Sequence, residues 1–250
     1  MSATQLVRHD RTRGVTTLTL DSPGNRNALS TALVAELSAS LRRAGEDEDV
    51  RAVVLTHTGS TFCAGADLKD PPDPAALVAL LRDIVALPRP VLARIDGHVR
   101  AGGLGLVGAC DIAAASARAS FAFTEVRIGV APAVISMPLL PRVDPRAAAR
   151  YYLTGERFDA AEAARIGLVT LAADAADGVD SALEPLLDGL RRSAPQALAE
   201  TKRLLTVKVL QALDRDAEAL TALSARLFAS DQAREGMTAF LERRDPAWVL

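Results

Sequence analysis

The chain has 250 residues, 49% of them hydrophobic and 24% charged, which is typical of a globular protein with a substantial core. Its formal net charge of −2 provides no basic surface for nucleic acid or an anionic membrane. No apolar stretch is long enough to cross a membrane, and the first residues lack the pattern of a secretion signal. We therefore expect a cytoplasmic protein that binds neither nucleic acid nor membranes.

Apolar periodicity predicts alternating strands and helices through about residue 173. Val15 to Leu20 alternates apolar residues with threonine, as a half-buried strand does, and Leu33, Leu37 and Leu41 then share one helical face. The expected elements that follow are strand 52–56, helix 75–87, strand 91–95, helix 104–110, strands 112–115 and 120–123, a helix starting at the capping box 159–162 and ending at Gly167, and strand 168–171.

The remainder of the chain is predicted to be almost all helix. Ala-rich amphipathic segments dominate residues 180–243, with Pro195 and Gly236 as the main expected breaks. The fold class is therefore α/β with a helical tail. Apolar stripes on such a tail pack either on its own body or on a neighbouring subunit, and the sequence leaves both open.

Two runs of small residues follow predicted buried strands. The first spans residues 62–68, Phe-Cys-Ala-Gly-Ala-Asp-Leu, and the second contains Ala101, Gly102 and Gly103. Small residues leave backbone N–H groups uncovered and let a ligand approach the main chain closely. If the two loops converge, two N–H donors can point at one oxygen that gains negative charge in a reaction.

Residues 103–108, Gly-Leu-Gly-Leu-Val-Gly, match the dinucleotide-binding pattern G-x-G-x-x-G, and Glu125 lies about 20 residues further on. That pattern requires an apolar strand leading directly into its first glycine. Here His98, Arg100 and the Ala101-Gly102 pair intervene, and the upstream loop would have no role. We therefore expect no NAD site.

Segments along nearly the whole chain, in order, are similar to a known family. They are Leu20 to Leu29, Phe62 to Lys69, Pro90 to Asp111, Phe121 to Pro132, Tyr152 to Phe158, Ala161 to Val169, and Glu235 to Arg244. Together they resemble the crotonase superfamily of enoyl-CoA hydratases and isomerases. The resemblance implies a crotonase-like spiral of ββα units over residues 1–187 with an acyl-CoA site. It also implies a C-terminal helical trimerisation region over residues 188–250, giving a homotrimer or hexamer.

The resemblance implies that the backbone N–H groups of Ala66 and Gly102 bind the thioester oxygen, in agreement with the two converging loops. Of the two glutamates that familiar hydratases use, the second corresponds to Glu125 and the first to Gly105, which has no side chain. Apolar neighbours around Glu125 would raise its pKa toward a range useful for proton transfer. Without the resemblance, Glu125 would be interpreted as a surface or salt-bridged glutamate beside Arg127.

Residues 125–136 resemble a subgroup associated with methylglutaconyl-CoA or related branched substrates. We therefore expect a hydro-lyase that adds water to a straight or branched 2-enoyl-CoA, with coenzyme A as part of the substrate and no separate cofactor. A Δ3-Δ2 enoyl-CoA isomerase is the first alternative, because one carboxylate can move a proton between two carbons. A non-catalytic acyl-CoA binding protein is the second.

The remaining expected contacts to the substrate and its coenzyme A also come from the resemblance. They are Ala64, Asp67, Leu68, Lys69, Gly103, Gly105, Phe240 and Arg243, with Lys69 near the nucleotide phosphates and the last two near the adenine. Cys63 and Cys110 are expected to be reduced packing residues, since one cysteine pair makes no disulfide framework. Nothing in the sequence has metal-ligand spacing.

Overall fold

The computed structural model describes residues 5–174 and 178–250. It begins with an antiparallel hairpin, β1 (Val7–Thr12) and β2 (Val15–Leu20), followed by the short 3₁₀ turn η1 (Pro23–Asn25) and helix α1 (Thr31–Glu46). Ser30 caps α1, its hydroxyl accepting from Leu33 N–H. Leu33, Leu37 and Leu41 are fully buried, which confirms the predicted helical face.

Three ββα units then follow in sequence, as the resemblance implied. They are β3 (Ala52–His57), β4 (Thr61–Cys63) and α2 (Pro74–Ala86); β5 (Val91–Ile95), β6 (His98–Arg100) and α3 (Gly102–Ala109); and β7 (Ile112–Ala115), β8 (Ser120–Ala122), the 3₁₀ turn η2 (Glu125–Ile128) and α4 (Ala133–Leu139). The first strands of the units pair in parallel in one sheet, and the second strands pair in parallel in another. The crotonase-like α/β fold is therefore confirmed.

The larger sheet has the order β1-β2-β3-β5-β7-β10, and the smaller has the order β4-β6-β8-β9. Helix α5 (Pro145–Thr154), β9 (Phe158–Asp159), α6 (Ala160–Arg165) and β10 (Leu171–Ala172) complete this part. The sequence did not reveal β1, β4, β6 or β9. In β1 every residue after Val7 is exposed, so it shows no apolar alternation, and the others are only two or three residues long. The strand predicted at 168–171 is mostly wrong, since pairing begins only at Leu171.

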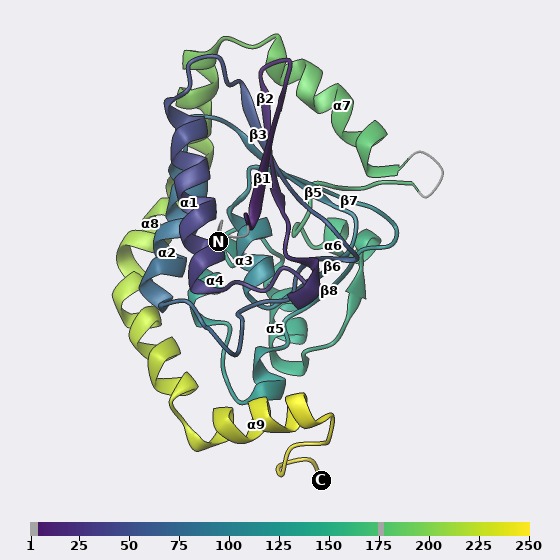
Figure 1. Cartoon of the computed structure of the whole chain (residues 1–250), viewed down its shortest axis with the longest axis vertical. Helices are drawn as coiled ribbons and strands as arrows, with labels where there is room; N and C mark the ends of the chain where they lie inside the picture. Colours follow the sequence, from purple (N-terminus) through teal and green to yellow (C-terminus); the bar gives the residue numbers. More distant parts are fainter. Residues whose placement is uncertain (1–4, 175–177) are drawn as a thin grey trace.

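The larger sheet is covered on both faces. All six residues of β3 are buried, which explains its continuous apolar run. The main core lies between the sheets and helices α1 to α4, while helix α7 (Gly178–Arg191) covers the opposite face with Val179, Leu183 and Leu187. Figure 1 shows α7 standing apart from the other helices, at the upper right.

The helical tail folds back on its own chain. Helix α8 (Pro195–Phe228) runs along α2 and α4, and α9 (Asp231–Glu242) crosses the lower end of the molecule and packs on η2 (Figure 1). The break expected at Pro195 is confirmed as the first residue of α8. The break expected at Gly236 is wrong, because this residue lies inside α9, where a close contact requires a residue without Cβ.

A buried ion pair fastens α8 to the body. Lys202 Nζ lies 2.7 Å from Asp111 Oδ2 and donates to the carbonyls of Ile84 and Arg89 at 2.9 and 3.1 Å. Asp111 Oδ2 also accepts from Val91 N–H at 2.7 Å. Burial lowers the pKa of Lys202, and the adjacent Asp111 carboxylate partly opposes that effect.

Candidate active site

Three loops of the site leave the same edge of the smaller sheet. Strands β4, β6 and β8 are parallel neighbours, and the residues that follow them are 64–68, 101–102 and 123–125. Ala101 N–H donates to Ala122 O at 3.2 Å, which holds the second and third loops together where they begin. The carboxyl ends of adjacent parallel strands are where α/β proteins place ligands, so this edge is the candidate site.

The first two loops pack so closely that side chains are excluded between them. A Cβ on Gly65, which has φ +96°, would lie 2.8 Å from Ala101 Cβ. A Cβ on Gly103 would lie 2.8 Å from Cys63 Cβ and 2.9 Å from the Cys63 carbonyl oxygen. These three separations are shorter than normal contacts of a Cβ with carbon or oxygen atoms, so both positions require glycine. The predicted convergence of the two loops is thus present.

The N–H groups of Ala66 and Gly102 are the two expected donors. Leu29 bridges to the first loop by donating to Gly65 O at 2.7 Å and accepting from Asp67 N–H at 2.9 Å, so Ala66 N–H points away from Leu29. Gly102 is the first residue of α3, where an N–H has no partner within the helix. A Cβ on Gly102 would lie 3.7 Å from Ala66 N, which shows how near the donors are to each other.

Strained backbone precedes the second donor. Ala101 has φ 46° and ψ −121°, a conformation that a residue with a Cβ rarely adopts. Such strain costs on the order of 1–3 kcal/mol and is commonly found at functional sites. Here it turns the chain sharply from β6 into α3 and brings Gly102 N–H to the loop edge.

Glu125 is the carboxylate of the site. It begins η2, is 7% exposed, and its carbonyl accepts from Val130 N–H at 3.1 Å. Burial raises the pKa of Glu125 from 4.5 to about 7, and a backbone N–H of its own residue opposes that effect. Its Oε2 is buried and has no hydrogen-bond partner within the described residues. An unpartnered buried carboxylate oxygen of this kind is suited to exchange a proton with a bound molecule.

Packing closes the space beside Gly105, the position that corresponds to the first of the two glutamates of familiar hydratases. A Cβ on Gly105 would lie 2.6 Å from Ile135 Cγ2 and 3.1 Å from Ile135 Cβ, with Leu81 Cδ2 at 3.5 Å. Ile135 on α4 therefore fills the space that a side chain at 105 would need. The absence of the glutamate is evident from the sequence, whereas the residue that occupies its volume is evident only from the packing.

Helix α9 supports the turn that carries Glu125. A Cβ on Gly236 would lie 2.5 Å from the Ile128 carbonyl carbon, and a Cβ on Gly129 would lie 2.6 Å from the Gln232 carbonyl. Main chain therefore packs on main chain at this contact. That the C-terminal helix positions η2 is not evident from the sequence, because neither glycine lies in a recognisable turn pattern.

The other expected substrate contacts lie around this edge or on α9. Ala64, Asp67 and Leu68 are partly buried in the first loop, and Asp67 accepts from Lys69 N–H at 2.9 Å and from Asn25 Nδ2 at 3.2 Å. The Lys69 side chain is exposed. On α9, Phe240 is 54% exposed and Arg243, which follows the helix, is also exposed.

The glycines of the 103–108 pattern serve packing, Gly103 against the first loop and Gly105 and Gly108 against α4. All lie within α3, where a Cβ on Gly108 would be 2.6 Å from Leu139 Cδ2 on α4. With Gly105 against Ile135, these residues let α3 and α4 approach closely. Since the three glycines lie within a helix and face packed atoms of the first loop and of α4, this motif forms no glycine loop that could hold a dinucleotide.

The cysteines and histidines near the loops have structural contacts. Cys63 and Cys110 are buried free thiols, and burial raises the pKa of each to about 12, which makes thiolate chemistry unfavourable. His57 accepts from Asp96 N–H through Nε2 at 3.1 Å, and burial lowers its pKa. Exposed His98 shares a 2.9 Å hydrogen bond with Ser120. None of these contacts points to a nucleophile.

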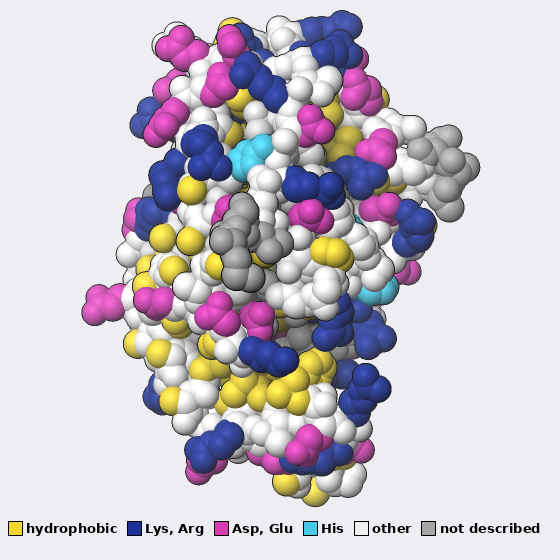
Figure 2. Space-filling model, in the orientation of Figure 1, with side chains coloured by type: hydrophobic (Ala, Val, Ile, Leu, Met, Phe, Trp, Pro, Cys, Tyr) yellow, Lys and Arg dark blue, Asp and Glu magenta, His cyan; other side chains and the backbone are white. Residues whose placement is uncertain are grey.

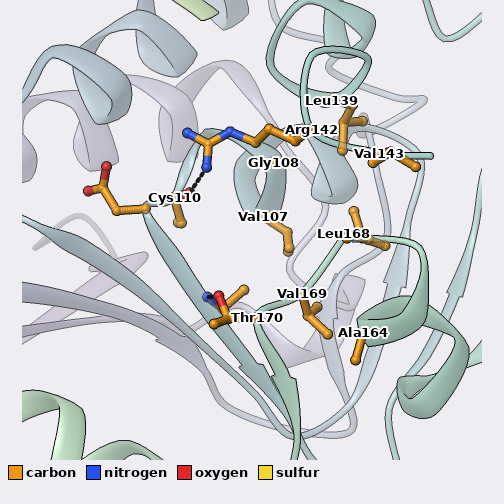
Figure 3. A pocket seen from close by; sticks show the side chains of 13 residues that line it. Val107, Gly108, Cys110, Leu139, Arg142, Val143, Ala164, Leu168, Val169 and Thr170 are labelled. Atoms are coloured by element: carbon orange, nitrogen blue, oxygen red, sulfur yellow. Dashed lines mark hydrogen bonds between the residues drawn. The ribbon is translucent and has the colours of Figure 1, made fainter. Parts of the chain in front are cut away.

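A cavity of about 310 Å³ lies at the opposite end of α3 from Gly102. Apolar residues such as Val107, Leu139 and Leu168 line it together with polar ones, and the Arg142 guanidinium at one side donates to Cys110 O at 3.1 Å (Figure 3). This cavity lies beyond the C-terminal end of the helix, so it is separate from the loop edge.

Within residues 5–174 and 178–250, no cluster of three or more His, Cys, Asp or Glu side chains is arranged to hold a metal. In the same ranges no helix has the length and apolarity to cross a membrane.

Comparison with known proteins agrees with this architecture. The family model described as enoyl-CoA hydratase/isomerase matches residues 10–249. A crystal structure of an enoyl-CoA hydratase from Mycobacterium avium is 56% identical, with a TM-score of 0.91 and complete coverage of both chains. The (E)-benzylidenesuccinyl-CoA hydratase of Thauera aromatica is 32% identical over 92% of this chain and 94% of its own. The carnitinyl-CoA dehydratase of Proteus mirabilis is 32% identical over 96% and 97%. The chain therefore belongs to the enoyl-CoA hydratase/isomerase family of the crotonase superfamily and is an enzyme of that kind.

Proposed function

We propose that this enzyme adds water to the double bond of a straight or branched 2-enoyl-CoA. The observation that carries the proposal is Glu125, a buried carboxyl with a pKa near 7 and one oxygen unpartnered, at the sheet edge that also presents Ala66 and Gly102 N–H. An acid/base group and two main-chain donors are the parts that addition to a thioester-activated alkene needs.

In the proposed reaction the thioester oxygen accepts from Ala66 and Gly102 N–H. The Glu125 carboxylate takes a proton from water as the water oxygen bonds to C3, and the electron pair of the double bond moves toward the thioester to give an enolate. Glu125, now protonated, returns the proton to C2, and the carbonyl reforms. The two N–H donors stabilise the enolate more than the substrate, because negative charge on the oxygen increases along the path.

The same loops supply the proposed substrate contacts. Ala64, Gly103 and Gly105 would contact the acyl part through small surfaces, while Asp67 and Leu68 border the first loop. The exposed ammonium group of Lys69 would pair with a phosphate of coenzyme A. Phe240 and Arg243, exposed on and after α9, would contact the adenine end, in this subunit or in a neighbouring one.

A Δ3-Δ2 isomerase is the second candidate, and the packing at Gly105 favours it. Because Ile135 occupies the space beside Gly105, the site has one glutamate and not two. A single carboxylate can remove a proton from C2 and return it to C4 without any water. The two candidates differ in whether a water molecule is bound beside Glu125.

A turnover screen separates these candidates. The enzyme is incubated with crotonyl-CoA, a 3-enoyl-CoA and 3-methylglutaconyl-CoA, and the absorbance of the conjugated thioester is followed. Hydration lowers this absorbance, and isomerisation of the 3-enoyl substrate raises it. If the enzyme hydrates neither crotonyl-CoA nor 3-methylglutaconyl-CoA, the proposed function is wrong. If it converts the 3-enoyl substrate and no other, it is an isomerase.

We also propose that the enzyme is a trimer or hexamer whose helical region, residues 188–250, makes subunit contacts. Apolar side chains remain exposed on α8 and α9, including Leu204, Leu205 and Leu241, which are 76%, 74% and 60% exposed. Figure 2 shows hydrophobic side chains gathered on the lower part of one face, above α9. Light scattering at micromolar concentration tests this, and a monomeric mass contradicts it.

Since Cys63 and Cys110 are unpaired, we place the enzyme in the cytoplasm.

A further inference from the structure

Two buried polar atoms of complementary kind lack partners near the site. The described residues contain five buried, unpartnered side-chain polar atoms: Glu125 Oε2, the Tyr152 hydroxyl oxygen, and the Nε atoms of Arg89, Arg142 and Arg191. Each of the three guanidinium groups makes hydrogen bonds through another nitrogen. The carboxylate oxygen accepts and the phenol can donate, and a buried polar atom left without a partner loses the hydrogen bond that it makes to water in the unfolded chain.

Tyr152 on α5 lies beside the segment that carries Glu125. Its ring packs on the Phe123 ring with centroids 4.3 Å apart, and Phe123 is two residues before Glu125. The end of α5 is fixed to η2 because Arg127 donates from Nε and Nη2 to Thr154 O at 3.2 and 3.1 Å. Burial, together with the Glu125 charge, raises the pKa of Tyr152, so the phenol keeps its proton at neutral pH.

The serine nearby does not take the place of a bound molecule. The Ser136 hydroxyl on α4, which lowers the pKa of Tyr152, donates its single hydrogen to Pro132 O at 2.6 Å. Within the described residues the Tyr152 hydroxyl has no hydrogen-bond partner, Ser136 included, so the phenol is left to bond to a bound molecule. Next to Ser136 on α4 is Ile135, whose side chain fills the space beside Gly105. Helix α3 contains no acidic residue, so no carboxylate from it reaches this region.

We propose that the Tyr152 hydroxyl is the second hydrogen-bonding partner of the attacking water, beside Glu125 Oε2, in place of the side chain that Gly105 lacks. This inference rests on the proposed hydratase function. A water that donates to Glu125 and bonds to the phenol still has a lone pair free for C3. Glu125 takes the proton, the oxygen bonds to C3, and Tyr152 orients the water while remaining protonated.

The neighbouring tyrosine provides a matched control. Tyr151 donates to Glu162 Oε1 at 2.7 Å, so its hydroxyl is used elsewhere. Tyr152→Phe and Tyr151→Phe each remove one oxygen atom from the same helix. Hydration of crotonyl-CoA is measured for both, together with exchange of the α-protons of butyryl-CoA in D2O. This exchange needs Glu125 and the two N–H donors but no attacking water.

We expect Tyr152→Phe to lower kcat for hydration about 10- to 100-fold, the effect of losing one hydrogen bond to the reacting water. KM should stay within threefold, the exchange rate within twofold, and Tyr151→Phe should match the wild type in all three. Hydration by Tyr152→Phe within twofold of the wild-type rate overturns the role of Tyr152. Exchange that falls in parallel with hydration also overturns it, because Tyr152 would then act on Glu125 itself. A wild-type enzyme that exchanges α-protons but hydrates nothing contradicts the proposed function instead.

Discussion

The two halves of the proposed site, the main-chain donors and the proton-transfer group, differ in what holds their atoms in place. The N–H donors of Ala66 and Gly102 belong to the main chain and are fixed by glycine contacts between two loops. The proton-transfer half depends on one side chain, Glu125, whose supporting turn is packed by α9 and α5. Main-chain donors are constrained by the loops themselves, whereas a buried carboxylate depends on its surroundings for both position and pKa. The second half is therefore where related chains can differ most in chemistry.

The largest expected effect comes from removing the single carboxylate. Glu125→Gln keeps the shape of the side chain but cannot exchange a proton, so we expect kcat to fall by about 10⁴-fold or more. Affinity for acetoacetyl-CoA, measured by calorimetry, should change no more than a few-fold. Near-normal turnover by this variant would show that proton transfer is performed by another residue.

Disturbing the loop contact tests the main-chain half. Gly103→Ala places a Cβ 2.8 Å from Cys63 Cβ, so the two loops must separate and the donors must shift. Loss of one aligned donor corresponds to about 10²–10³ in kcat. Gly189→Ala is the control, because a Cβ there meets nothing within 4 Å. Equal kcat values for the two variants would contradict the proposed role of the loop contact.

The raised pKa of Glu125 predicts a stability cost. Between 4.5 and about 7 the native carboxyl holds its proton while the unfolded one has lost it, so stability falls as pH rises through this window. Glu125→Gln removes this cost and should be more stable than the wild type at pH 8 by about 3 kcal/mol, from 1.36 kcal/mol per pKa unit. Urea unfolding at pH 5 and pH 8 measures the difference. A gap of the same size at both pH values would show that Glu125 is not the titrating group.

The packing at Gly105 predicts that a glutamate introduced there, with no other change, does not raise the rate of hydration. Gly105→Glu should destabilise the enzyme by about 1–3 kcal/mol through overpacking against Ile135, without raising crotonyl-CoA hydration. The double variant Gly105→Glu with Ile135→Gly should regain stability because the added side chain then has space. Thermal unfolding and initial rates check both variants. A stable single variant with faster hydration would mean that Ile135 moves aside easily.

The sequence predicted the main-chain half of the site better than the proton-transfer half. Periodicity located β2, β3, β5 and β7 of the larger sheet and helices α1 to α3, and small residues after two strands indicated convergent loops. The closure beside Gly105 was not predictable, because it depends on Ile135, thirty residues away and ordinary in composition. Tyr152 was equally hidden, since a tyrosine in a helix is usually a packing residue. Gly236 was misinterpreted as a helix break, because sequence alone does not show that Ile128 main chain lies against it.

The contact between Ile135 and Gly105 also constrains how this enzyme could have changed over time. A glutamate at 105 and a bulky residue at 135 exclude each other, so a lineage moving between one and two glutamates must pass through an intermediate. The intermediate with both small residues has a void but still folds, while the one with both large residues is overpacked. Isoleucine at 135 therefore makes the absence of a glutamate at 105 difficult to reverse by a single substitution, because that reversal passes through the overpacked state.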